Sequence, residues 1–583
     1  MPIVSYNLSQ FKKLFSSKYT CIAIILIVSF GVYLNTMWNG FVYDDEFQVL
    51  ENPWIKDVRY IHDIFLSHVW AFQGVGWVSN YYRPMMHIIL MIDYYLFGLK
   101  PWGYHLINII LHAGVSVLVF LIASMLINHP GRREKRLSPP FTGGEKGEGE
   151  YNLLFPLIAA ILFAAHPIHT EVVAWVSGIP ELSFTLFYLL SFYFYIKADD
   201  EYGKHFILSI LFFFLSTLCK ETALTLPILL IVYDYSSSQS KIQNLKSHMM
   251  RYIPYIIVAG IYFTLRTNAI GGFAPQKAHP ELDNWQYLIN IFPLFIQYLE
   301  KLILPINLNA YHVLHPISSI LEWKAIASVI ITFAFILTAY FLRKIDKLSF
   351  FSLLLIVITI LPVLYIPALG ENTFAERYLY LPSIGFVILM ALTLERIYCN
   401  RRLGQTASLA TILAAIVLLG LYCAGTLKRN FIWRDNYTLW SETVKKSPDG
   451  AIPHNSMGVV YLKQGRLDEA LQEFQTALKL EPDYSNAHIN LGISFANKGW
   501  LDDAIKEFKL AIRLKSDNPE AYNNLGATYY DKGWVDMAIE HYLIALRLKP
   551  NYRKAHYNLA EAYYDKGWVD MAIEHYRIAQ DLK

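Results

Sequence analysis

Long apolar segments alternate with short polar ones from the N-terminus to about residue 425. A helix that crosses a bilayer needs roughly 17 to 25 mostly apolar residues, and about eleven segments meet or approach that length. The predicted spans centre on 19–38, 104–126, 153–174, 181–197, 204–219, 222–235, 251–265, 322–342, 349–367, 378–396 and 405–424. The pattern predicts an all-α, multispanning membrane domain over residues 1–425.

Two further apolar segments, 83–98 and 285–303, carry polar interruptions such as Asp93 and Glu300. Such interruptions suit helices that lie in the membrane interface or re-enter the membrane from one side. We therefore expect neither segment to cross the bilayer.

Lysine and arginine between the spans predict the orientation, because positively charged short loops resist translocation. With a cytoplasmic N-terminus and a retained first span, every basic cluster falls on the cytoplasmic side, as does the Gly- and Pro-rich segment 131–150, a predicted flexible loop. The number of crossings is then odd, which places the loop 39–55 and the C-terminal part outside the cytoplasm. The basic residues are Lys12, Lys13, Lys18, Arg132, Arg133, Lys135, Arg136, Lys197, Lys204, Lys241, Lys246, Arg251, Arg343, Lys344, Lys347, Arg396, Arg401 and Arg402.

Residues 451–583 are polar and periodic, and follow an aromatic connector at 426–450. Glycines recur every 34 residues at Gly465, Gly499, Gly533 and Gly567. This period is typical of tetratricopeptide repeats, which are pairs of antiparallel helices that stack into a solenoid with a concave binding face. Four repeats are predicted. Asparagines on their first helices could hydrogen-bond an extended peptide or could simply be solvated: Asn455, Asn490, Asn523, Asn524 and Asn558.

Composition agrees with a membrane protein. Hydrophobic residues make up 55% of the 583 residues and charged residues 17%, which is too apolar for one soluble globular protein. A net charge of +3 gives no indication of nucleic-acid binding. The cysteines have no paired spacing, so neither a zinc site nor a disulfide framework is indicated; they are Cys21, Cys219, Cys399 and Cys423.

Ionisable residues gather at span ends on the predicted outer side. Charged groups near the hydrocarbon core are costly and tend to mark a substrate path. Arginine and lysine can bind phosphate and a carboxylate can act as acid or base, so the set suits an anionic lipid-linked group. Its members are Asp44, Asp45, Glu46, Arg83, His105, His112, His166, His169, Glu171, Lys220, Glu221, Glu376 and Arg377.

Plainer alternatives exist for several members. Asp44 and Asp45 could cap a loop helix, and Arg83 and Arg377 could be anchors that reach the interface. The pattern H-x-x-H-x-E at 166–171 supplies metal-ligand types, but its spacing and proline do not demand a metal, and no H-E-x-x-H motif is present. We expect a polar site wall there and no bound metal.

Five segments resemble the transmembrane and tetratricopeptide repeat-containing proteins, members of the multispanning GT-C glycosyltransferase superfamily related to protein O-mannosyltransferases. The resemblance covers nearly the whole chain. It implies transfer of a hexose, mannose in the characterised eukaryotic relatives, from a polyprenyl-phosphate carrier to Ser or Thr of a protein on the outer face. The reaction implied is inverting and metal-independent, with no cofactor beyond the lipid-linked donor. The segments are "FVYDDEFQVLENPWI", "NYYRPM", "AAHPIHTEVVAWVSG", "LCKETALTLPILLIVYDY" and "AERYLYLPSIGF".

In that superfamily an acidic pair in the first outer loop is catalytic, and here the pair falls on Asp44 and Asp45. We expect Asp44 to be the general base and Asp45 to position the acceptor or tune its charge. Arg377 is expected to bind the donor phosphate, with Arg83 and Lys220 as further candidates.

The remaining ionisable residues, His166, His169, Glu171, Glu221 and Glu376, are expected to line the site or the acceptor path. After "VSG" many relatives carry a basic residue and an aspartate, whereas this chain has "IPE" at 179–181. This departure puts a donor contact at that position in question.

Two other functions share these features. A non-catalytic membrane scaffold would use the repeats to recruit proteins, but it leaves the polar motifs at one membrane face unexplained. An oligosaccharide transferase would use the same fold with a larger cavity. For each, the expected membrane is the bacterial inner membrane or the endoplasmic reticulum.

Overall fold

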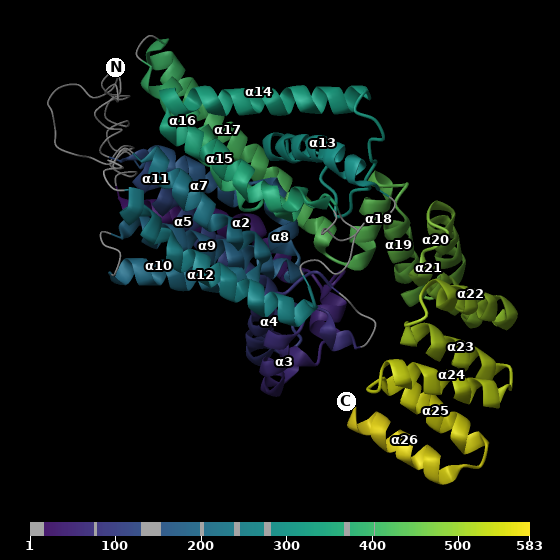
Figure 1. Ribbon diagram of the computed structural model, residues 1–583. Coiled ribbons are helices and arrows are strands. Elements are labelled where there is room, and N and C mark those ends of the chain that lie inside the picture. The colour runs from purple at the N-terminus through teal and green to yellow at the C-terminus, as the bar shows by residue number, and fades with distance from the viewer. Residues whose placement is uncertain are drawn as a thin grey trace. The chain divides into compact units, whose positions relative to one another are not determined.

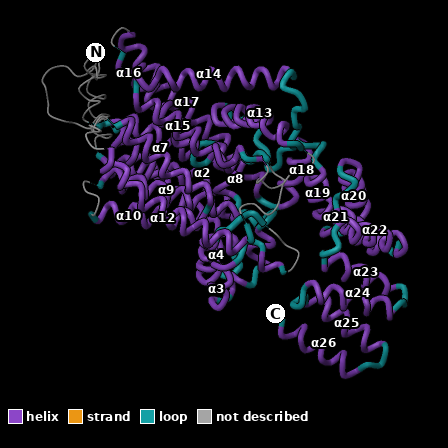
Figure 2. The backbone as a smooth tube through the Cα atoms, viewed as in Figure 1, coloured by secondary structure: helices purple, strands orange, loops and turns teal. Residues whose placement is uncertain are grey.

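The computed structural model describes residues 17–74, 79–129, 153–198, 203–237, 245–272, 282–366, 373–400 and 403–582. Within these ranges the chain is helical and contains no strand (Figure 2), as the sequence predicts. The segment 131–150 lies outside the described residues, as do several of the predicted basic positions: Lys12, Lys13, Arg132, Arg133, Lys135, Arg136, Lys241, Arg401 and Arg402.

The chain divides into two compact units. The membrane unit comprises Met1–Val69, Ser79–Ala310 and Leu314–Asp435. The repeat unit comprises Trp70–Val78, Tyr311–Val313 and Asn436–Lys583. Each unit is described by itself below.

Each predicted span forms helix in the membrane unit (Figure 1). The helices are α2 (Lys18–Tyr33), α5 (Pro101–Ile127), α7 (Leu154–Ala165), α8 (Thr170–Ala174), α9 (Ile179–Lys197), α10 (Lys204–Cys219), α11 (Leu226–Ser236), α12 (Leu245–Ile270), α14 (Trp323–Ile345), α15 (Lys347–Ile360), α16 (Pro382–Cys399) and α17 (Gly404–Asn430). Among the described residues, eight helices are long and apolar enough to cross a membrane, and α7 with α8, bent by 45°, makes a ninth. Helices α10 and α11 have only 16 and 11 residues. Length and composition thus support eight or nine spans rather than about eleven.

The two segments expected not to cross form α4 (Pro84–Phe97) and α13 (Asn284–Ile303), and neither is among those eight helices. Helix α13 buries Leu294 and Tyr298 on one face and leaves Trp285 and Leu288 half exposed on another. An amphipathic helix with an exposed tryptophan suits the interface between hydrocarbon and water.

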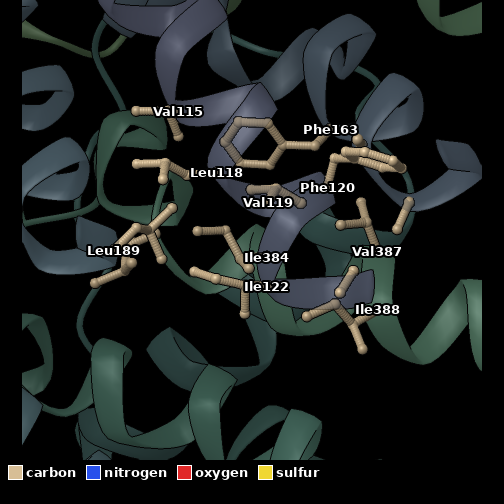
Figure 3. Close-up of a cluster of buried hydrophobic side chains, with 14 of the residues drawn as sticks. Val115, Leu118, Val119, Phe120, Ile122, Phe163, Leu189, Ile384, Val387 and Ile388 are labelled. Carbon is tan, nitrogen blue, oxygen red and sulfur yellow. The ribbon is translucent and has the colours of Figure 1, made fainter. Parts of the chain in front are cut away.

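The largest apolar cluster lies where α5, α7, α9 and α16 pack together (Figure 3). Val119 and Phe120 from α5, Phe163 from α7 and Val387 from α16 are fully buried in it. Branched and aromatic side chains fill the space between these helices, so their ends, which carry the polar motifs, are held on a packed support.

The repeat unit contains the four predicted helix pairs, drawn in green to yellow in Figure 1. Each pair turns at a glycine with φ between +74° and +79°, a conformation that costs a residue with a side chain more than glycine. A second glycine lets the two helices of a pair meet: a Cβ at Gly492 would lie 2.7 Å from the Phe508 ring. After α18 (Asn436–Lys446) come α19 (Ala451–Lys463), α20 (Leu467–Leu480), α21 (Ser485–Asn497), α22 (Leu501–Leu514), α23 (Pro519–Asp531), α24 (Val535–Leu548), α25 (Arg553–Asp565) and α26 (Val569–Asp581).

Close packing of α15 on α16 generates a stability prediction. A Cβ at Gly385 would lie 2.5 Å from the carbonyl oxygen of Ser352, so Gly385→Ala must push the helices apart. We expect the variant to lose about 1 to 3 kcal/mol of stability, the usual effect of overpacking, measured by thermal unfolding in detergent. The control is Gly260→Ala on α12, where the new Cβ would meet no atom within 4 Å. Equal stability of the two variants would show that this contact is not tight.

Candidate functional site

Asp45 ties the loop after α2 to the turn before α9. Its side chain is fully buried. One carboxylate oxygen accepts hydrogen bonds from the backbone N–H (2.7 Å) and hydroxyl (2.6 Å) of Ser177, and the other accepts from the backbone N–H of Val42 (3.1 Å). Asp45 makes no side-chain cap to the helical turn Glu46–Glu51 that follows it, so the capping alternative fails for this residue.

The two neighbouring carboxylates therefore have different surroundings. Burial raises the pKa of Asp45 to about 7, because hydrogen bonds from Ser177 and Val42 offset only part of the desolvation and Asp44 adds repulsion. Asp44 is only partly buried. Of the two, Asp44 is the carboxylate that a substrate can reach from solvent.

Trp175 links this loop to the predicted phosphate-binding arginine. Tyr43 stacks on Trp175 with ring centroids 5.5 Å apart, and the guanidinium of Arg377 lies 5.6 Å from the Trp175 ring centroid. Tyr43 has φ +57°, one of two positive values among the described non-glycine residues. Backbone of this kind is sterically costly and is often found at functional sites.

Arg377, in the short helix η11 (Glu376–Leu379), is held twice by Glu171. Its backbone N–H donates to one carboxylate oxygen at 3.1 Å and its guanidinium to the other at 2.5 Å. The side chain of Glu171 is 2% exposed and that of Arg377 is 17% exposed. A paired and mostly buried arginine differs from a free anchor at the membrane surface.

Two more ion pairs continue the network. Lys220 lies 2.6 Å from Glu181, whose carboxylate is also 4.0 Å from Nε of Arg377. Burial lowers the pKa of Lys220, and the Glu181 carboxylate opposes this shift. Arg83 donates to Glu221 at 2.9 Å. The structure therefore brings the three predicted cations together with a carboxylate beside each.

A small cavity of about 10 Å³, room for about one water molecule, lies next to two of these cations. Guanidinium and ammonium groups both form charge-assisted hydrogen bonds to phosphate oxygens. An oxygen of an anion bound at this place would therefore lie beside both Lys220 and Arg377. It is lined by Phe184, Lys220, Thr222, Thr359, Val363, Arg377, Tyr378, Leu381 and Pro382.

Glu376 faces a different partner from its neighbour Arg377. It is fully buried, accepts from the backbone N–H of Asn309 at 2.5 Å, and pairs with Arg429 near the end of α17. Sequence reasoning missed Arg429, which lies in the connector segment. The sequence feature that could have revealed Arg429 is its position in the last turn of an apolar helix, where a basic residue needs a nearby partner.

The histidines are integrated into the helix bundle. His166 contacts the carbonyl of Leu302 at 3.2 Å and accepts from the backbone N–H of Ile168, while His169 contacts the hydroxyl of Ser383 at 2.8 Å. Both rings are fully buried, and neither lines the cavity. Among the described residues, no three His, Cys, Asp or Glu side chains form a cluster that could hold a metal ion. The role of His166 and His169 as a site wall stays a prediction.

In the repeat unit the predicted asparagines pair between neighbouring first helices. Asn490 donates to Asn455 at 2.9 Å, and Asn558 donates to Asn523 at 3.0 Å. The amide nitrogen of Asn524 is buried and has no hydrogen-bond partner within the described part of the chain. Asn455 and Asn524 are 8% and 7% exposed, so simple solvation does not describe them.

Family models agree with the repeats in the C-terminal part of the chain. The family models described as "TPR repeat" and "Tetratricopeptide repeat" match residues 458–499, 494–533, 528–567 and 554–583. A solved structure, the crystal structure of MamA, is 24% identical with a TM-score of 0.24 and covers 27% of this chain and 90% of its own.

Curated relatives match most of the chain. Protein O-mannosyl-transferase F38B6.6 of Caenorhabditis elegans is 28% identical, over 78% of this chain and 62% of the relative. Protein O-mannosyl-transferase TMTC3 of Mus musculus is 26% identical, over 78% of this chain and 50% of the relative. The chain thus spans about half to two thirds of the length of these relatives. The resemblance seen in the motifs is confirmed: the chain is similar to proteins that are named protein O-mannosyl-transferases.

Proposed function

We propose that the chain is a GT-C-type glycosyltransferase that moves a hexose, mannose by analogy with its relatives, from a polyprenyl-phosphate carrier to Ser or Thr of a protein. One observation carries the proposal. The loop bearing Asp44 and the cation Arg377 share the ring of Trp175, and Arg377 lines a cavity together with Lys220. The loop that carries the proposed base and the proposed phosphate-binding arginine are therefore neighbours across Trp175.

Asp44 serves as the general base in this proposal. A Ser or Thr hydroxyl is a poor nucleophile at neutral pH, so a carboxylate must take its proton as the oxygen attacks the anomeric carbon. Such base catalysis contributes typically about 10²- to 10⁴-fold. Asp45, buried and bonded to Ser177 and Val42, keeps the loop in place instead.

The donor phosphate binds at Arg377 and Lys220, with Arg83 beside Glu221 as a further contact. The bond from the anomeric carbon to the phosphate oxygen breaks, and its electron pair stays on the phosphate. Cations fixed beside that oxygen stabilise the developing charge, so no acid is needed on this side. Among the described residues of the site, no cluster of side chains could hold a metal ion. The proposed reaction uses no metal.

The repeats hold the polypeptide acceptor. Paired asparagine amides on the first helices offer donors and acceptors that match a peptide backbone. We place the N-terminus in the cytoplasm and the repeats outside it, in the bacterial inner membrane or the endoplasmic reticulum. This orientation follows from the basic residues between the spans.

Accessibility of single cysteines tests the orientation. Lys506 lies in the repeat unit, Lys197 lies at a predicted cytoplasmic end, and both are exposed. In a chain whose four native cysteines are replaced, Lys506→Cys should react with a membrane-impermeant maleimide from outside intact cells or, for an endoplasmic reticulum protein, from the lumenal side. Lys197→Cys should react only from the cytoplasmic side. The reverse pattern would rule out the orientation and the site of transfer with it.

The buried state of Asp45 predicts a pH dependence of stability. Its folded-state pKa of about 7 lies above the unfolded value, so folding favours the protonated form. The contribution is complete below about pH 4 and is lost as the pH rises through 7, by about 4 kcal/mol at most. The stability difference between wild type and Asp45→Asn should fall over this range and level off above pH 8, as followed by unfolding in detergent. A difference independent of pH would contradict the burial of a titrating carboxylate.

Replacement of the base tests the function directly. Asp44→Asn keeps the size of the side chain but removes its basicity, so transfer from a labelled polyprenyl-phosphate hexose to an acceptor peptide should fall about 100-fold or more. Donor binding should persist. The matched control, Asp57→Asn, changes an aspartate on the same outer loop whose carboxylate accepts hydrogen bonds from Arg59, and it should transfer normally. Near-normal transfer by Asp44→Asn would remove the base role from this residue.

A further inference from the structure

Glu181 stands behind the two cations of the cavity. It lies in the first turn of α9 with a side chain only 3% exposed, 2.6 Å from Lys220 and 4.0 Å from Nε of Arg377. Lys220 and Arg377 line the cavity, whereas Glu181 does not. The Glu181 carboxylate thus lies next to both Lys220 and Arg377, the groups that would hold a phosphate, but does not itself line the cavity.

The buried charges around this place cancel in pairs. With every group ionised, the four contacts Lys220–Glu181, Arg377–Glu171, Arg83–Glu221 and Arg429–Glu376 sum to zero. Arg266, beside Glu221, adds one positive charge, and the neighbouring carboxylates Asp44 and Asp45 add two negative charges when both are ionised. Within the described residues, the site therefore has no excess of positive charge for a bound anion.

The charge of the lipid-linked phosphate changes during the proposed reaction. The donor is a phosphodiester with one negative charge. After the bond to the sugar breaks, the lipid is left as a phosphomonoester with a charge of about −1.5 to −2 at neutral pH. A charge that is buried without full compensation is strongly unfavourable, so a neutral pocket disfavours the product more than the donor.

We propose that Glu181 determines the charge selectivity of the phosphate site: it cancels one of the two cavity cations, so the site accepts a lipid phosphodiester and releases the lipid phosphomonoester. This inference rests on the proposed function. The same cancellation weakens the stabilisation of charge that develops on the phosphate, so the arrangement gives up some chemical rate for faster release of product. The alternative is that Glu181 only holds Lys220 in position and does not determine which lipid the site prefers.

Two lipid probes of equal chain length separate these cases. Polyprenyl phosphate represents the product, and its methyl ester represents the singly charged donor. Their dissociation constants are measured on the full chain in detergent at pH 7.5. Wild type should bind the methyl ester more tightly. In Glu181→Gln the preference should shift toward polyprenyl phosphate by about tenfold or more, because one buried counter-charge is gone.

Controls distinguish charge from geometry. Glu181→Asp keeps the charge and should keep the wild-type preference. Glu395→Gln removes another buried carboxylate. Glu395 lies near the end of α16 that is opposite to Pro382, the α16 residue that lines the cavity. This variant should change the dissociation constant of neither lipid. Equal weakening of both lipids in Glu181→Gln would make Glu181 a geometric support and overturn the inference.

The wild type alone also tests the inference if Glu181→Gln does not fold. Tighter binding of polyprenyl phosphate than of its methyl ester would overturn the charge selectivity while leaving the proposed donor class intact. Binding of neither lipid would overturn the proposed donor, and the inference with it.

Discussion

The ion pair between Arg377 and Glu171 is the constraint around which the polar end of the bundle is arranged. Glu171 accepts from both the backbone and the guanidinium of Arg377, which also reaches toward Glu181. A buried charge that loses its partner costs about 3 to 5 kcal/mol. The segment η11, far along the chain from α8 and α9, therefore has to meet these two helices at one place, and the cavity forms beside η11 and α9.

Asp44 and Asp45 illustrate how environment gives adjacent identical residues different capabilities. Both carboxylate oxygens of Asp45 accept hydrogen bonds, from Ser177 and from Val42, and burial raises its pKa to about 7. It can fix the loop, but a substrate cannot reach it without breaking those bonds. Asp44 keeps part of its surface toward solvent, beside the strained backbone of Tyr43. Proton transfer needs access as well as basicity, which favours Asp44.

Helices and repeats were predictable because they follow from local periodicity. Apolar length predicts spans, and the 34-residue period predicts helix pairs whose glycines face aromatic rings, such as Gly492 and Phe508. Partners of buried charges were not predictable, because they depend on how segments far apart in the sequence pack. Glu181 looked like a departure from a motif, yet it is the residue that pairs with Lys220. Arg429 looked like part of a connector, yet it neutralises Glu376.

The presence of four ion pairs, three largely buried and the Arg83–Glu221 pair partly exposed, is itself informative about function. Apolar residues of similar volume often give equal or better stability than a buried ion pair, so folding alone does not require these four pairs. A site that binds and releases an anion within a membrane does require cations, and cations held without substrate require counter-charges. Lys220 and Arg377 can then stay charged and in place while the cavity is empty, because Glu181 and Glu171 already satisfy them.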